Sequence, residues 1–266
     1  MKKKRVVVTL AACSMIVALG VGSTIAYLTD QSEATNNFTF GDVKVDVEEP
    51  DWDTTDADNN GVPDMAENVV PNQVVKKSVQ AKNVGINDAI VFVKVTVPLE
   101  NVTRVKDDGT RELNASGASD RKLQEVFYFQ DESDIINLEN NNFDAQWVNI
   151  PEEEIGYAGA GANDEYLDLS DTREYSGNVR TYVFGYNKRI AKDETTTKLF
   201  DKVQIKNYIE NEINPLTTKS IKVETYSIQA DNIVDKNGAI DTKGTLGHDT
   251  LKEIYDIYVT QNPDRK

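Results

Sequence analysis

Residues 91–97 read Val-Phe-Val-Lys-Val-Thr-Val, and this stretch decides the fold class. Its valines occupy every odd position, while phenylalanine, lysine and threonine occupy the even positions. A period of two is typical of a β-strand, because successive side chains point to opposite faces of a sheet. The stretch therefore predicts a central strand of a β-sandwich.

Strand-like runs dominate the rest of the chain. Beyond a run at 43–47, the candidates are residues 102–105, 126–129, 146–150, 180–186 and 220–230. The run at 102–105 is followed by Asp107-Asp108-Gly109, which predicts a hairpin turn because glycine tolerates a positive φ. The chain is thus expected to be mostly β and antiparallel.

Two of these runs change phase along their length. Phe38 and Phe40 occupy even positions, whereas the valines of 43–47 occupy odd ones, so a bulge at Gly41 would restore the register. The run 220–230 changes phase near Thr225 in the same way. Bends of this kind are typical of strands that cross between two sheets.

One helix is predicted near the C-terminus. Its apolar stripe follows the i, i+3, i+4, i+7 pattern and consists of Leu251, Ile254, Tyr255 and Tyr258. Thr250 and Glu253 have the spacing of a capping box. Residues 131–145 and 151–178 are polar and predict long loops with short helical pieces.

Residues 1–26 have the organisation of a signal peptide. Four basic residues (2–5) precede an apolar run at 6–21, and small residues end at Ala26, so cleavage is expected between Ala26 and Tyr27. An uncleaved anchor is the alternative, but a membrane span takes about 20 predominantly apolar residues and this run is interrupted. A lipobox reading ending at Cys13 is opposed by the apolar residues that continue after it.

Composition limits the classes of function. Removing 26 residues from 266 leaves 240, enough for one large β domain at 27–266, the preferred interpretation, or two small ones. Removing the four basic residues of the leader from a net charge of −16 leaves −20, which disfavours nucleic acid and anionic lipid and favours divalent cations. Cys13 is the only cysteine, so the processed chain would have no disulfide.

Residues 56–67 match the twelve-residue calcium loop D-x-[DN]-x-[DN]-G-x₅-E at every defined position. This loop would follow the first strand, and Gly61 would permit its sharp turn. The expected Ca²⁺ ligands are Asp56, Asp58, Asn60, the Val62 carbonyl, Asp64 and Glu67.

The flanks of this loop do not resemble an EF-hand. The residues before it alternate like a strand and contain Pro50, and Pro63 has no N–H with which to pair a second loop. An isolated extracellular loop binding structural calcium at about 10⁻⁴ to 10⁻³ M is predicted, with a solvated polar turn as the alternative. Residues 235–238 are a weaker echo and predict only a turn.

Catalytic patterns are scarce. His248 is the only histidine, which excludes an H-E-x-x-H zinc site, and no G-x-S-x-G elbow is present. A thiol nucleophile is absent from the processed chain. A carboxylate pair for glycoside hydrolysis stays open, because the distance between two carboxylates cannot be read from a sequence. The chain is therefore predicted not to be an enzyme.

A family resemblance adds to this reading. The leader with residues 27–30 (Tyr-Leu-Thr-Asp) and residues 37–45 resembles the substrates of the SipW-type signal peptidase of Gram-positive bacteria, the TasA/camelysin family. The likeness continues in patches at 83–98, 197–203 and 223–231. It implies a jelly-roll-like β-sandwich that is secreted to the cell surface or biofilm matrix, with the membrane involved only through the leader before cleavage.

The resemblance also implies self-assembly into fibres or association with other matrix proteins. In such fibres the N-terminal segment of one subunit, roughly residues 27–47 here, adds as a strand to the next subunit. The alternative is that this segment pairs within its own sheet. Two other functions stay open: a calcium-stabilised surface adhesin or binding module, and a camelysin-type metallo-endopeptidase, for which the expected zinc-binding histidines are lacking.

Overall fold

The computed structural model describes residues 41–106, 108–131, 143–150, 179–213 and 218–263. These residues belong to one compact unit that begins at Gly41. The leader, the expected cleavage site at Ala26 and Tyr27, and Phe38 and Phe40 lie outside the described residues, as does most of the two predicted polar loops.

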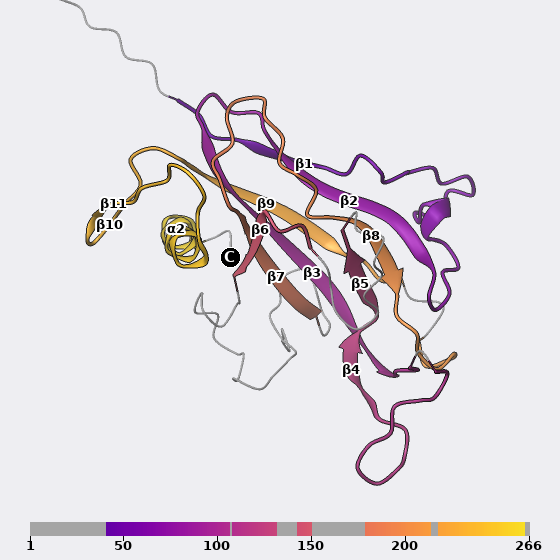
Figure 1. The fold of residues 1–266 in the computed structure, drawn as a ribbon. Coiled ribbons are helices and arrows are strands. Elements are labelled where there is room, and N and C mark those ends of the chain that lie inside the picture. Colours follow the sequence, from indigo (N-terminus) through magenta and orange to yellow (C-terminus); the bar gives the residue numbers. More distant parts are fainter. Residues whose placement is uncertain (1–40, 107, 132–142, 151–178, 214–217, 264–266) are drawn as a thin grey trace, which may run out of the picture. The chain divides into compact units, whose positions relative to one another are not determined.

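The described residues form a mostly β, sandwich-like fold of antiparallel strands, which confirms the predicted fold class (Figure 1). The first sheet has the order β1 (Val45–Glu48), β2 (Val74–Asn83), β8 (Phe200–Ile205), β5 (Phe127–Gln130). The second has the order β4 (Arg121–Glu125), β3 (Ala89–Thr103), β7 (Val179–Tyr186), β6 (Trp147–Ile150), and β9 (Lys222–Gln229) also pairs with β3. The remaining elements are a 3-10 helix η1 (Asp64–Ala66), the hairpin β10 (Val234–Asp235) and β11 (Gly238–Ala239), and the helix α2 (His248–Gln261).

Strand β3 contains the Val-Phe-Val-Lys-Val-Thr-Val stretch and lies at the centre of the second sheet. Its odd-numbered valines are buried in a core between the two sheets, where Phe129 and Phe200 of the first sheet meet Phe184 of the second. Its even-numbered Phe92 faces the other way, into a second core beneath α2. This part of β3 is therefore buried on both faces, and its alternating side chains are divided between the two cores.

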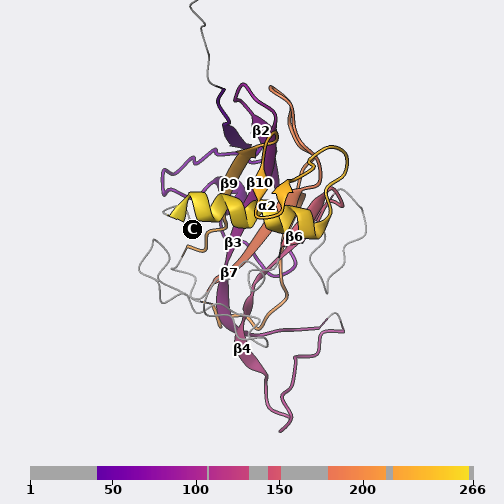
Figure 2. The same ribbon diagram turned by 90° about the vertical axis from the view of Figure 1, so that its left-hand side faces the viewer.

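Helix α2 covers the outer face of the second sheet (Figure 2). The four residues of the predicted stripe are all buried. The Tyr255 ring packs edge-on against Phe92, with ring centroids 5.0 Å apart. Burial of this apolar stripe is what fixes the helix, because isolated helices of this length are marginal in water.

The predicted capping box is wrong. The helix begins at His248, three residues earlier than a cap at Thr250 would place it, and its N-cap is Gly247, with no capping side chain. The N–H of Leu251 already donates to the carbonyl of Gly247 at 3.0 Å, so the first turn closes before Thr250 could act as a cap. Glu253 instead lies against Asp235 of the β10–β11 hairpin, which raises the pKa of Glu253.

The predicted break near Thr225 is also wrong. Strand β9 pairs with β3 without a register shift, and Thr225 lies opposite Val93. Both faces of β9 are covered: Val223 packs against the core between the sheets, and Tyr226 packs against the core beneath α2. The change of phase in the sequence reflects two cores, because apolar side chains can occur on either face of a strand that is covered on both sides.

The predicted turns are confirmed where they are described. Gly109 has a φ of +80°, and its N–H donates to the carbonyl of Lys106 at 2.9 Å; Asp107 lies outside the described residues. The echo at residues 235–238 is the tight turn of the β10–β11 hairpin. No helix in the described part of the chain is long and apolar enough to cross a membrane.

Candidate functional sites

The twelve-residue loop 56–67 lies between β1 and β2 and closes around Asp56. The Asp56 carboxylate accepts hydrogen bonds from the N–H of Asn60 at 3.1 Å and from the N–H of Gly61 at 2.9 Å. The φ of Gly61 is +87°, a conformation that favours glycine. These hydrogen bonds lower the pKa of Asp56, and the bond from Gly61 has the largest effect. The Asp56 carboxylate therefore stays ionised in mildly acidic solution.

The side chains of the other expected ligands are linked through Asn60. Its amide nitrogen donates to the Asp58 carboxylate at 3.1 Å and also to Glu67, so the third, fifth and twelfth positions of the loop are brought together. Asp64 accepts from the N–H of Ala57 at 3.0 Å. Among the described residues, no three His, Cys, Asp or Glu side chains converge as the ligands of a metal ion do.

This donor set fits calcium by its chemistry. Carboxylate, amide and carbonyl oxygens are the hard ligands that calcium takes in groups of six to eight. The N–H donors of Asn60 draw Asp58 and Glu67 together, as a cation between the two carboxylates would. Val62 would contribute its backbone carbonyl, and its N–H donates to the Asn60 side-chain oxygen at 2.8 Å.

A second candidate is the edge formed by the start of the described chain. β1 pairs antiparallel with β2, with Val45 opposite Asn83 and Val47 opposite Ala81. β1 is an edge strand of the first sheet, and among the described strands it pairs only with β2. Strand β9 passes close to β1, but its ladder runs to β3. Of the predicted donor segment 27–47, the described part therefore pairs within its own chain.

Four further hydrogen bonds hold the chain ahead of β1. The carbonyl of Lys44 accepts from the N–H groups of Val84 and Gly85, and the carbonyl of Asp42 accepts from those of Ile86 and Asn87, at 2.9 to 3.1 Å. A Cβ at Gly85 would lie 2.7 Å from the Asp42 carbonyl oxygen and 2.7 Å from the Lys44 nitrogen. Glycine is required here because the two backbones touch.

The link from β1 to the calcium-type loop is held by two lysines that sequence reasoning missed. Lys77 is 8% exposed; its Nζ lies 2.5 Å from Glu49 Oε1 and 4.5 Å from the centroid of the Trp52 ring. Lys198 Nζ lies 2.7 Å from Asp51 Oδ2, and this hydrogen bond is the main cause that lowers the pKa of Asp51. No local pattern marks these pairs, because their members are far apart in sequence.

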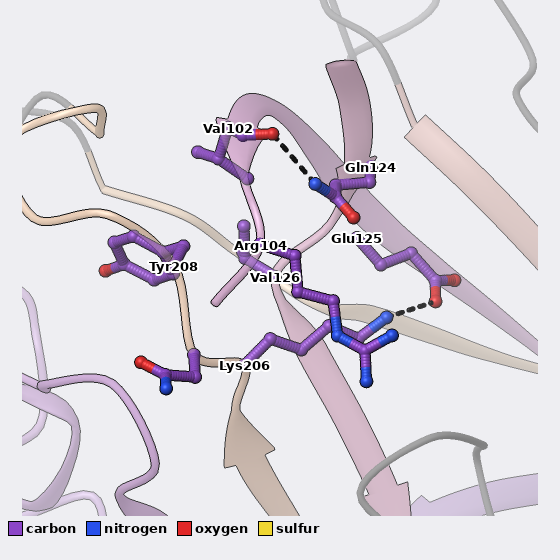
Figure 3. Close-up of a pocket in the computed structure, with 8 residues that line it drawn as sticks. Val102, Arg104, Gln124, Glu125, Val126, Lys206 and Tyr208 are labelled. Atoms are coloured by element: carbon purple, nitrogen blue, oxygen red, sulfur yellow. Dashed lines mark hydrogen bonds and ion pairs between the residues drawn. The ribbon is translucent and has the colours of Figure 1, made fainter. Parts of the chain in front are cut away.

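A third candidate is a small pocket at the point where the chain crosses from one sheet to the other (Figure 3). Glu125 ends β4 in the second sheet, and only Val126 separates it from β5 in the first sheet. The pocket is lined by Val102, Arg104, Gln124, Glu125, Val126, Lys206, Asn207 and Tyr208.

The Glu125 carboxylate is buried and has three polar partners. Tyr182 donates its hydroxyl hydrogen to it, Lys206 Nζ lies 3.4 Å away and Arg180 Nε lies 3.7 Å away. Burial lowers the pKa of Lys206, with Glu125 opposing that shift. Tyr182 and Arg180 lie on β7 of the second sheet, and Lys206 directly follows β8 of the first sheet, so this network joins the two sheets by charge.

Neither the models of known protein families nor the curated proteins give a match to this chain. The lone histidine, His248, begins α2 and has Nδ1 3.0 Å from Asp249 of the same turn.

Proposed function

We propose that this protein is a secreted structural protein of the cell surface or biofilm matrix, a fibre-forming subunit or an accessory to one, which assembles by addition of its N-terminal strand. The observation that carries the proposal is the position of β1: a strand of only four residues at the edge of a sheet, directly preceded by the N-terminal segment. The leader and the resemblance to the TasA/camelysin family support the extracellular setting.

The physical argument is that strand exchange conserves contacts. The β1 residues pair with Gln80 to Asn83, and a second copy of β1 placed on that edge would make the same ladder. Exchange of an identical element between copies costs little in contact energy, and open sheet edges accept extended segments. Repetition of such head-to-tail contacts gives a filament when the rotation between neighbouring copies does not close a ring.

A cross-linking experiment tests strand exchange directly. A protein that begins at Tyr27 has no cysteine, so cysteines can be added one at a time. Asp46 and Lys82 lie opposite each other across β1 and β2, and neither side chain is in the core. Mixing Asp46→Cys protein with Lys82→Cys protein should give disulfide-linked heterodimers.

The control replaces the second partner with Val74→Cys, on the same strand β2 but opposite Gln204 of β8. The Val74 side chain is 43% exposed, so this mixture reports random collisions. Heterodimers that do not exceed the control, together with no filaments in negative-stain micrographs of the Tyr27 protein, would overturn the proposal. A protein that begins at Glu49 lacks β1 and should form no filaments.

We further propose that the loop 56–67 binds structural calcium and thereby orders the connection between β1 and β2. With a dissociation constant of about 10⁻⁴ to 10⁻³ M, about 10 mM calcium would add roughly 1.4 to 2.7 kcal/mol to the free energy of unfolding. Thermal unfolding with calcium, with magnesium and with chelator measures this effect. An unfolding temperature that ignores calcium would refute the calcium site and leave the fibre proposal standing.

A calcium-stabilised adhesin or binding module is the second candidate function. The specific observation in its favour is that β1 pairs with its own sheet, which makes the described unit self-sufficient as a monomer. A protein that stays monomeric at all salt and calcium concentrations, and that binds glycans on an array, would establish this function in place of assembly.

A further inference from the structure

Two kinds of contact hold the chain on either side of Glu49. Ahead of it, β1 is attached by backbone hydrogen bonds, by half-buried Val45, which packs against the core between the sheets, and by ion pairs on the surface. Lys82 and Glu48, for example, are 3.9 Å apart, and both side chains are more than a third exposed. Such exposed pairs contribute little, because water screens both charges.

After Glu49 the contacts are charged and partly buried. The Lys77 side chain is 10% exposed and contacts both Glu49 and the face of the Trp52 ring. A lysine this buried depends on its partners, because an unpaired charge in the interior is costly. Moving residues 49–52 away would remove both partners from Lys77 at once.

A second lysine, just before β8, binds the same short segment. Lys198 Nζ reaches Asp51 at 2.7 Å, and the Asp51 N–H donates to Ser78 Oγ at 3.2 Å. The Trp52 N–H donates to the Glu49 carbonyl at 3.1 Å, which keeps the segment in a turn. Residues 49–52 are therefore attached to β2, through Lys77 and Ser78, and to Lys198, which lies just before β8.

We propose that residues 49–52 form an ionic anchor that stays on its own subunit, so that the part of the N-terminal segment able to leave its sheet ends at Glu48. This inference rests on the proposed function, since it sets the limit of the exchanged strand. The hinge then lies between Glu48 and Glu49.

Hydrogen exchange of monomeric protein beginning at Tyr27 tests the anchor. If the chain opens up to Glu48 and no further, the β1 amides of residues 45–48 will exchange at least tenfold faster than the amides of Asp51 and Trp52. Equal rates for the two groups would overturn the proposal, because opening would then run through the anchor.

The Lys198→Met variant provides the second arm. The Lys198 side chain is 30% exposed, so the variant keeps the fold while losing the pair with Asp51. The exchange rates at Asp51 and Trp52 should rise at least fivefold, toward those of β1. The matched control is Lys82→Met, which removes the pair with Glu48 and should leave Asp51 and Trp52 unchanged; equal effects of both variants would also overturn the anchor.

The outcome is separable from that of the fibre proposal. Exchange is measured on monomers, so two distinct rates in a protein that never forms filaments would support the anchor and refute the fibre function. Filaments from a protein with one uniform rate would refute the anchor alone.

Discussion

Replacement of Gly85 by alanine tests whether residues 41–44, ahead of β1, are held by a close backbone contact with the turn at 84–87. The φ of Gly85 is not positive, so alanine can adopt its conformation and only space is at issue. The added Cβ would lie 2.7 Å from two backbone atoms of residues 42 and 44. Backbone atoms cannot move aside like the end of a flexible side chain, so residues 41–44 must separate from the turn at 84–87.

The loss can be estimated from the four hydrogen bonds that join these segments. At a net contribution of roughly 0.5 to 1.5 kcal/mol each, their loss costs about 2 to 6 kcal/mol. Urea unfolding of Gly85→Ala protein beginning at Tyr27 measures this cost. In the cross-linking mixture, the variant should also exchange its β1 strand faster, because the closed position is weakened.

The matched control is Ile86→Ala in the same turn. The Ile86 side chain is 63% exposed, so its removal should change the free energy of unfolding by less than about 0.5 kcal/mol. A Gly85→Ala protein with the same urea midpoint as this control, and with unchanged cross-linking, would refute the reasoning.

Three further predictions concern charged groups. In the calcium-type loop, Asp56→Asn or Glu67→Gln should remove most of the calcium-dependent rise in unfolding temperature without changing the unfolding temperature in chelator by more than a few degrees, as calorimetry will show. In the inter-sheet network, Lys206→Met should lower the free energy of unfolding by about 3 kcal/mol because it leaves buried Glu125 short of a partner, and adding Glu125→Leu should recover much of this in urea titrations. The hydrogen bonds from Lys198 and Ser78 lower the folded-state pKa of Asp51, so the stability that Asp51 contributes is present above about pH 4 and is lost as the pH falls through the folded-state pKa. Proteolysis near residues 49–52 should increase at that low pH, and the increase should be smaller in Asp51→Asn, in which only the pair of Glu49 with Lys77 still depends on pH.

The sequence predicts the features that depend on residues close together in the chain. The strand at 91–97 and the stripe of α2 were correctly placed, because their periods report which side chains are buried. The calcium-type ligands are predicted for the same reason, since twelve consecutive residues contain the whole set. The start of α2 was misplaced because its cap is backbone at Gly247, and a backbone cap has no side-chain signature.

The contacts that join distant parts of the chain could not be predicted. The members of the Lys198–Asp51 pair are 147 residues apart, and those of the Lys206–Glu125 pair are 81 apart. A lysine and an acid in a chain with 45 acidic residues have many possible partners, and only the fold selects one. The phase change in β9 misled for a related reason: its second core is built by a helix that lies after it in the chain.

The arrangement of charge around β1 has a consequence for assembly. The two sheets are joined inside by Glu125 and its partners, and the connection after β1 is held by buried Lys77. β1 itself has exposed Val47, half-buried Val45 and surface ion pairs. Local opening follows the weakest contacts, so under the proposed strand exchange β1 is the part expected to leave while the sandwich stays intact. A subunit that opened in this way would expose the β2 edge without unfolding its core, and that is the condition under which strand exchange competes with aggregation.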